Sequence, residues 1–143
     1  MPNKKIKIDL VRTDKVFYPG NNYTKGDVID YYSRISIYQL PHIKNRPLVT
    51  QRFPDGIKKS GFYQKETPNY FPSWMKTKRI NLKKGGQQEL VIPTKTEDLI
   101  YLANLGGLVF HTWLAAAKQP RQPDKIIFDL DPPPIQDFAL VKF

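Results

Sequence analysis

Hydrophobic and polar residues follow two different periods in the first third of the chain. Within residues 6–10 apolar side chains alternate with charged ones, which predicts a short strand with one buried face. From 25 to 39 the apolar residues recur at helical spacing, after Thr24 and Asp27 in an acidic variant of the N-terminal capping box. We therefore expect a helix that begins at about Lys25 and ends before Pro41, because a proline interrupts helical hydrogen bonding.

Two pairs of extended runs predict hairpins in the middle of the chain. Residues 47–53 and 61–65 flank the turn signal Pro54-Asp55-Gly56. Residues 76–82 and 89–92 flank a second turn that contains Gly85 and Gly86.

The last third of the chain begins with a second helix signal. Thr94 and Glu97 form a capping box ahead of a helix that includes Ala103. Paired glycines and then β-branched and aromatic residues predict a strand over 108–113, and residues 125–131 predict a last strand. Together these elements predict one α+β domain over residues 1–143, with a mixed sheet, hairpins and flanking helices.

Length and composition limit the class of protein. A chain of 143 residues, 40% hydrophobic and 25% charged, is long enough for one domain with its own core. It contains no cysteine, which excludes disulfides and thiolate metal sites. No apolar run is long enough to cross a bilayer, so we expect no membrane partner. An intracellular setting is compatible with these features.

The formal net charge of +10 favours polyanionic partners such as nucleic acid. Many basic proteins share this charge without binding nucleic acid. Charge alone therefore leaves the two alternatives about equally open.

The run Phe128-Asp129-Leu130-Asp131-Pro132 places two carboxylates at positions i and i+2. In a strand these side chains share one face, and close like charges are unfavourable unless a cation lies between them. Hard cations such as Mg²⁺ and Mn²⁺ prefer carboxylate oxygens. The alternative is a solvated strand end before a proline turn, and this short pattern alone slightly favours that alternative.

Ordered blocks along almost the whole chain resemble the polymerase domain of bacterial DNA ligase D, a member of the archaeo-eukaryotic primase superfamily. The early blocks are Asp14-Lys15-Val16-Phe17-Tyr18-Pro19, Thr24-Lys25-Gly26-Asp27, Arg46-Pro47-Leu48 and Arg52-Phe53-Pro54-Asp55-Gly56. The later blocks are Gly61-Phe62-Tyr63-Gln64-Lys65, Leu102-Ala103-Asn104-Leu105-Gly106, His111-Thr112-Trp113 and Phe128-Asp129-Leu130-Asp131-Pro132. The resemblance implies a primase-polymerase-like fold.

The resemblance also implies roles for the two aspartates. Asp129 and Asp131 match catalytic, metal-binding carboxylates of a template-directed nucleotidyltransferase, with Mn²⁺ or Mg²⁺ in a two-metal site. The family takes a third carboxylate from later in its domain than Phe143, the last residue here. We therefore expect an incomplete domain, in which independent catalysis is in doubt.

Other matching positions face DNA or nucleotide in the family. Lys15 and Lys25 match lysines that bind the 5′-phosphate at a DNA gap, and the N-terminus of a helix that begins near Lys25 would also favour an anion. Phe62 and Tyr63 match an aromatic pair that stacks on bases. Because alternation buries one ring of such a pair, we favour Tyr63 for the contact.

Two further positions match residues near the family's nucleotide. Arg52 is the candidate nucleotide contact next to the Pro-Asp-Gly turn, where the family often carries Lys-Arg and this chain has Gln51-Arg52. His111 matches a strand histidine near the active site, and a purely structural histidine is the equal alternative.

These features leave different classes of function open. The first is a gap-filling or end-extending polymerase or primase of non-homologous end joining. Its partners would be gapped or broken DNA with a 5′-phosphate, nucleoside triphosphates, and the ligase and end-binding proteins of the pathway, in a nucleoid-associated cytoplasmic setting. The second is a non-catalytic module that recognises DNA ends through a 5′-phosphate. A degenerate remnant without its own function is the third.

Overall fold

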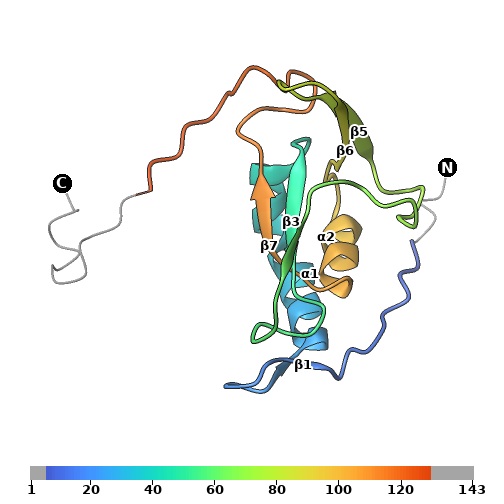
Figure 1. Cartoon of the computed structure of the whole chain (residues 1–143). Coiled ribbons are helices and arrows are strands. Elements are labelled where there is room, and N and C mark those ends of the chain that lie inside the picture. The colour runs from blue at the N-terminus through green and yellow to red at the C-terminus, as the bar shows by residue number, and fades with distance from the viewer. Residues whose placement is uncertain (1–5, 130–143) are drawn as a thin grey trace, which may run out of the picture.

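The computed structural model describes residues 6–129 of the chain (Figure 1). Its helices are α1 (Lys25–Ile43) and α2 (Thr96–Asn104). Its strands are β1 (Val16–Tyr18), β2 (Tyr23–Thr24), β3 (Leu48–Arg52), β4 (Phe62–Gln64), β5 (Thr77–Asn81), β6 (Gln87–Val91) and β7 (Gly107–Thr112). Neither described helix is long and apolar enough to cross a bilayer.

The strands form a small hairpin and one larger sheet. β1 pairs with β2, while the larger sheet has the order β4-β3-β6-β5, with β7 on the other side of β3. The two predicted hairpins are confirmed as β3–β4 and β5–β6, and the α+β class is confirmed as well. The strand pairings within residues 6–129 are antiparallel.

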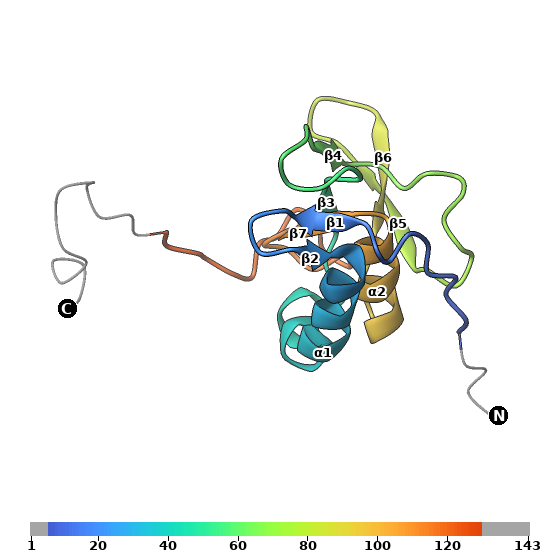
Figure 2. The ribbon, with the colours of Figure 1, turned by 90° about the horizontal axis from the view of Figure 1, so that it is seen from below.

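Both described helices lie on the same side of the large sheet (Figure 2). Buried side chains of α1 and α2, among them Ile29, Leu99 and Ala103, pack with Phe17 into one core cluster, and Phe110 of β7 packs against it. This packing leaves the other face of β3, β4 and β7 without a covering helix among the described residues.

The first helix begins as the sequence predicts and ends later. The Thr24 side chain accepts a hydrogen bond from the backbone of Asp27, and the Asp27 carboxylate accepts one from the backbone N–H of Thr24, which confirms the capping box. The predicted end before Pro41 is wrong, because α1 continues to Ile43. Pro41 lies in the last turn and has no N–H to donate to the carbonyl of Ile37. Because Ile37 is exposed, water can bind this carbonyl instead.

The second helix is capped by a different residue from the one predicted. α2 begins at Thr96, and the buried Asp98 carboxylate accepts hydrogen bonds from the backbone N–H groups of Thr94 (2.7 Å) and Lys95 (3.1 Å). The predicted capping box of Thr94 with Glu97 is therefore shifted by one residue. Adjacent acidic residues make such a shift hard to recognise from sequence.

Residues 6–10 do not form the predicted first strand. The side chain of Asn104 at the end of α2 holds this segment instead. Its amide N–H₂ donates to the carbonyl of Asp9 (3.0 Å), and its oxygen accepts from the backbone of Val11 (3.1 Å). Ile6 and Ile8 are half-buried, as the alternation predicts, but Leu10 is exposed and none of the described strands pairs with this segment.

The predicted last strand is also absent from the described part of its range, since residues 125–129 have no regular secondary structure. Ile126, Ile127 and Phe128 are 79%, 68% and 81% exposed. A strand needs a partner for its backbone groups, and none of the described strands pairs with this segment. Asp131 lies outside the described residues.

Candidate nucleic-acid interface

The uncovered side of the sheet carries two of the predicted site residues. We call this surface the open face and define it by Val49, Gln51, Tyr63, Val109 and His111. Gln51 of β3 lies between Tyr63 of β4 and Val109 of β7, and Val49 pairs with His111. The rings of Tyr63 and His111 have centroids 5.5 Å apart, so β3 brings together two aromatic side chains from distant parts of the sequence.

Arg52 and Phe62 form a separate group on the opposite side of β3 and β4. They are paired across the two strands, and the Arg52 guanidinium lies over the Phe62 ring at 5.2 Å from its centroid. Arg52 also donates to the carbonyl of Leu105 and to the side chains of Gln64 and Tyr70, each at 2.9 Å. These contacts orient Arg52 away from the open face.

The predicted difference in burial between Phe62 and Tyr63 is wrong. Alternation does place the two rings on opposite faces, but Phe62 is 46% exposed and Tyr63 is 52% exposed. β4 is a short strand at one side of β3, and the Arg52 guanidinium stacks on Phe62 in place of a hydrophobic core. Both rings are therefore accessible from solvent.

The β1–β2 hairpin brings Lys15 and Lys25 together. Val16 pairs with Thr24, and the backbone N–H of Lys25 donates to the carbonyl of Lys15 (2.7 Å). We call Arg12, Lys15 and Lys25 the basic cluster. Burial, followed by the positive charges of Lys15 and Arg12, lowers the pKa of Lys25 from its usual value. The cluster therefore concentrates positive charge at the start of α1.

Both lysines of the basic cluster already have protein partners. Lys25 is 7% exposed, and its ammonium donates to the carbonyl of Val11. The Lys15 ammonium donates to the carbonyl of Pro54 (2.8 Å) and pairs with the Asp55 carboxylate. That hydrogen bond and the charge of Lys15 lower the pKa of Asp55. The cluster thus contacts the loop of the β3–β4 hairpin.

The backbone at the start of α1 does not provide the free donors that the sequence suggested. The N–H groups of Lys25 and Gly26 donate to the carbonyls of Lys15 and Thr13, both at 2.7 Å, and the N–H of Asp27 donates to the Thr24 hydroxyl. A side chain at Gly26 would approach the Thr13 carbonyl to 3.0 Å, so glycine permits this close contact. An anion at this site would be bound mainly by side chains.

The predicted metal ligands are not assembled by the described residues. Asp129 is exposed at the end of the described range, and Asp131 lies beyond it. Within residues 6–129 no three His, Cys, Asp or Glu side chains lie close enough together to hold a metal ion.

An ion pair that the sequence did not reveal anchors the segment before Asp129. The guanidinium of Arg46, buried beside β3, donates to both carboxylate oxygens of Asp124, at 2.6 Å and 2.9 Å. This bidentate hydrogen bond lowers the pKa of Asp124. The two residues are 78 positions apart, and no local pattern links them.

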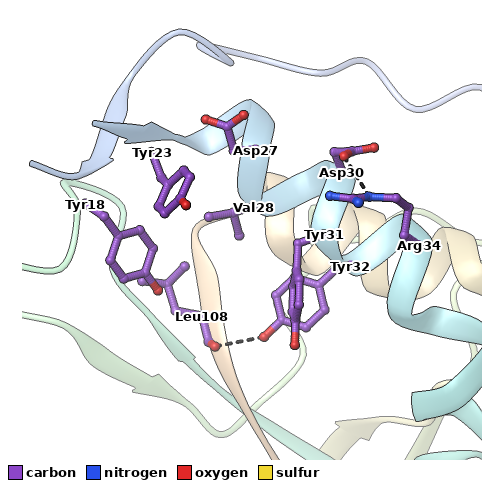
Figure 3. Close-up of a pocket in the computed structure, with 9 residues that line it drawn as sticks. All are labelled: Tyr18, Tyr23, Asp27, Val28, Asp30, Tyr31, Tyr32, Arg34 and Leu108. Carbon is purple, nitrogen blue, oxygen red and sulfur yellow. Dashed lines mark hydrogen bonds and ion pairs between the residues drawn. The ribbon is translucent and has the colours of Figure 1, made fainter. Parts of the chain in front are cut away.

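A pocket of about 610 Å³ lies between α1, the β1–β2 hairpin and the start of β7 (Figure 3). Its lining is rich in tyrosine: Tyr18, Tyr23, Asp27, Val28, Asp30, Tyr31, Tyr32, Arg34 and Leu108. The Tyr32 hydroxyl donates to the carbonyl of Leu108 (2.8 Å), and Asp30 pairs with Arg34 (2.9 Å). Sequence spacing gave no signal for this pocket, because its walls come from three separate elements.

Comparison with known proteins links the chain to a described family. The model of the primase-polymerase domain of LigD matches residues 24–142. Among curated proteins, the multifunctional non-homologous end joining protein LigD of Mycolicibacterium smegmatis is 34% identical over 88% of this chain and 17% of its own length. The bifunctional non-homologous end joining protein LigD of Bacillus subtilis is 33% identical over 94% of this chain and 21% of its own.

A solved structure is similar over most of the described fold. The polymerase domain of ligase D from Mycobacterium tuberculosis, in complex with DNA, superimposes with a TM-score of 0.73 at 28% identity. The match covers 76% of this chain and 37% of that domain. The chain thus spans about a fifth of the two curated relatives and less than half of the solved domain.

Proposed function

Because the chain belongs to the LigD primase-polymerase domain family, we propose that it takes part in template-directed nucleotide transfer during non-homologous end joining. The observation that supports the proposal is that the open face and the basic cluster both involve the β3–β4 hairpin. Tyr63 and His111 lie on one side of β3, and Lys15 contacts the loop at the end of the same β3–β4 hairpin. Aromatic groups and cations are the two components of a surface that binds DNA without reading its sequence.

On the open face, Tyr63 is the group best suited to stack on a base. Its ring is half-exposed, and stacking of this kind contributes about 1–3 kcal/mol per base. We assign to His111, whose ring lies beside that of Tyr63, a contact with a phosphate of the DNA or of an incoming nucleoside triphosphate. Phe62, with Arg52 stacked on it, offers a second exposed ring on the other side of β4.

We assign recognition of a 5′-phosphate to Lys15 and Lys25. The Lys15–Asp55 pair is accessible, with side-chain exposures of 25% and 69%, and accessible ion pairs contribute little stability. A phosphate carrying up to two negative charges can therefore displace Asp55 from Lys15. Lys25 and Arg12 add positive charge behind this contact.

The metal ligands in this proposal are Asp129 and Asp131, with Mn²⁺ or Mg²⁺ as the cofactor. Two carboxylates at i and i+2 supply the hard oxygen donors that these ions prefer. Within residues 6–129 no three His, Cys, Asp or Glu side chains gather to hold a metal ion, so the proposed site needs Asp131 as well as Asp129. Bound metal would activate the attacking hydroxyl and stabilise the leaving pyrophosphate.

Primer extension tests the catalytic part of the proposal. The purified chain is mixed with gapped DNA, nucleoside triphosphates and Mn²⁺, and the length of the primer is measured. Extension that is lost in Asp129→Asn is the expected result. Absence of extension in the unchanged chain would contradict catalysis by this chain.

A non-catalytic module that binds DNA ends is the second candidate, favoured by the convergence of Arg12, Lys15 and Lys25. Under this alternative the chain binds 5′-phosphorylated gaps more tightly than unphosphorylated gaps and extends no primer. Lys15→Ala should remove the preference for phosphate, and Lys25→Ala should weaken it. Lys59→Ala changes another lysine near Asp55 and serves as a charge-matched control. An unchanged preference in both Lys15→Ala and Lys25→Ala would refute the phosphate assignment.

A further inference from the structure

Asn104 is a buried polar residue to which the proposed function assigns no role. It is the last residue of α2 and is 8% exposed. Both polar atoms of its carboxamide bind one distant segment: the N–H₂ donates to the carbonyl of Asp9, and the oxygen accepts from the N–H of Val11. A buried carboxamide needs partners for its donors and its acceptor, so these hydrogen bonds fix the segment against the end of α2.

The side chain of Asn104 is not needed to close its own helix. The N–H of Leu105 donates to the carbonyl of Tyr101 (3.1 Å). One residue later, the N–H of Gly106 donates to the carbonyl of Ala103 (2.8 Å). Backbone hydrogen bonds of this kind satisfy the last carbonyls of a helix. The carboxamide at the end of α2 therefore serves the distant segment that it binds.

We call residues 9–13 the strap, because they run past α2 and lead to the basic cluster (Figure 1). Val11 links the two, since its N–H donates to the carboxamide at the end of α2 and its carbonyl accepts from the Lys25 ammonium. Two residues further on, the carbonyl of Thr13 accepts from the N–H of Gly26 (2.7 Å). The strap therefore joins the end of α2 to the first turn of α1.

Arg12 lies in the strap with a φ of 54°, in the left-handed region that residues with a Cβ rarely occupy. Such a conformation costs free energy and persists only where the surrounding contacts hold it. On one side the carbonyl of Arg12 accepts from the N–H of Lys15 (3.2 Å), and on the other Asn104 binds the N–H of Val11. Burial, then the charge of Lys15 and then that of Arg12 lower the pKa of Lys25, so the Arg12 guanidinium is close enough to act on this ammonium.

Ordering of these cations before an anion arrives should favour its binding. Long side chains such as lysine and arginine lose rotamer freedom when they bind a ligand, and a protein that orders them beforehand avoids that cost at binding. Lys25 is already ordered in this way, because it is 7% exposed and its ammonium binds the Val11 carbonyl. Release of the strap would remove this contact and the backbone contacts that hold Arg12, so the positive charges would no longer converge.

We propose that Asn104 is a positioning residue for recognition of a 5′-phosphate: it anchors the strap and thereby holds Arg12 and Lys25 in place beside Lys15 before the phosphate binds. This role rests on the proposed function, which assigns the phosphate to the basic cluster. Asn104 acts on the phosphate only through the strap. Its hold on the strap can be measured without DNA, so that part stands or fails independently of the proposed function.

Amide hydrogen exchange, followed by NMR without DNA, tests whether Asn104 holds the strap. Asn104→Leu introduces a side chain of similar size that cannot bind Asp9 or Val11. The N–H of Gly26, which donates to the strap, should then exchange at least about tenfold faster, because local opening no longer breaks the Asn104 hydrogen bonds. The N–H of Leu105, at the same end of α2, is the internal control and should change much less. No acceleration at Gly26, or equal acceleration at both positions, would overturn the proposal.

Binding of gapped DNA tests the effect of the strap on phosphate recognition. The affinity for a 5′-phosphorylated gap divided by that for an unphosphorylated gap is measured by fluorescence anisotropy. We expect this ratio to fall about 3-fold to 10-fold in Asn104→Leu, with little change in the affinity for the unphosphorylated gap. Leu102→Ala is the control, because it shortens a buried side chain in the same turn of α2 that packs with Leu48 and Met75. It should lower stability and keep the ratio.

The possible results distinguish the role of Asn104 from the phosphate assignment itself. A ratio that Lys15→Ala removes and Asn104→Leu leaves unchanged would overturn the role of Asn104 and keep the assignment. An equal fall in Leu102→Ala would also overturn it, because loss of stability would then explain the effect. A ratio of one in the wild type would refute the assignment and, with it, this role. If Asn104→Leu does not fold, the same results are expected of Asn104→Ser, whose hydroxyl is too short to bind both strap residues.

Discussion

Phe110 and His111 are neighbours on β7, yet Phe110 lies on the helix-covered face of the sheet and His111 lies on the open face. Phe110 faces the helices, where it packs against the core cluster of Phe17, Ile29 and Leu99. His111 faces the other side, where its one aromatic neighbour in the described structure is Tyr63. One strand therefore contributes a side chain to the core and, at the next position, a side chain to the open face.

Substitutions on the two faces should therefore have different effects, on folding stability for the helix-covered face and on DNA binding for the open face. Residues of the helix-covered face lose contacts with several elements when they are shortened, which costs folding free energy. Residues of the open face have few such contacts, so their replacement leaves the fold nearly unchanged. Of the two faces of the sheet, only the open face is therefore expected to give a large effect on DNA binding without a change in stability.

The largest effect on stability is expected for Leu99→Ala on the covered side. Leu99 is fully buried, and such a substitution typically lowers the free energy of unfolding by about 2–5 kcal/mol. Val109→Ala on the open face, where Val109 is 40% exposed, should lower it by less than about 1 kcal/mol. Urea unfolding of both variants measures the difference, and equal losses would show that the two faces are not distinct.

A smaller loss is expected for Asp98→Ala at the start of α2. Its carboxylate accepts hydrogen bonds from the backbone of Thr94 and Lys95, so its removal should cost about 1–2 kcal/mol. Glu97→Ala changes the neighbouring carboxylate and should have little effect. The reverse order in thermal unfolding would mean that Glu97 is the cap after all.

Because of Tyr32, the stability of the fold should depend on pH in the alkaline range. Burial, followed by the nearby Tyr31, raises the pKa of Tyr32 to about 12 from 10.0. The neutral phenol therefore stabilises the fold fully below pH 10, and this contribution is lost as the pH rises toward 12. Comparison of urea unfolding of the wild type with Tyr32→Phe across this range isolates the effect. An identical pH dependence in the two proteins would contradict it.

Loss of the Tyr32 hydroxyl should lower the free energy of unfolding only modestly at neutral pH. Tyr32→Phe leaves the carbonyl of Leu108 without its partner, at a cost of about 0.5–1.5 kcal/mol. Urea unfolding at pH 7 measures this cost, and no change would mean that water replaces the hydroxyl.

The smallest effect on stability is expected for His111→Ala. His111 is exposed on the open face, where its ring lies beside that of Tyr63, so the free energy of unfolding should change by at most about 0.5 kcal/mol. A loss comparable with that of Leu99→Ala would assign His111 a structural role instead.

Several features that depend on a few adjacent residues were predictable from the sequence, although the capping box of α2 was predicted one residue too early and the end of α1 before Pro41 was wrong. The capping box of Thr24 with Asp27 and the turns of the β3–β4 and β5–β6 hairpins are local, and all are confirmed. Features that depend on a distant partner were not. Residues 6–10 and 125–129 have strand-like patterns, but the described structure pairs neither with a neighbouring strand.

The candidate site shows the same limit. Resemblance identified Tyr63 and His111 individually, but their proximity depends on β3, which pairs with both β4 and β7. Resemblance likewise identified Lys15 and Lys25, whereas their occupied hydrogen bonds to Asp55 and Val11 depend on loops that no pattern described. The Arg46–Asp124 pair had no local signal at all.

The central claim, that the open face binds DNA, is tested most directly by comparing two exposed tyrosines. Tyr63 lies on the open face at 52% exposure, and Tyr38 lies on α1 at 70% exposure. Binding of fluorescent gapped DNA is measured by anisotropy for the wild type, Tyr63→Ala and Tyr38→Ala. We expect Tyr63→Ala to weaken binding by roughly 5-fold to 150-fold, the equivalent of about 1–3 kcal/mol of stacking, and Tyr38→Ala to leave it unchanged. Equal affinities for all three proteins would contradict the claim.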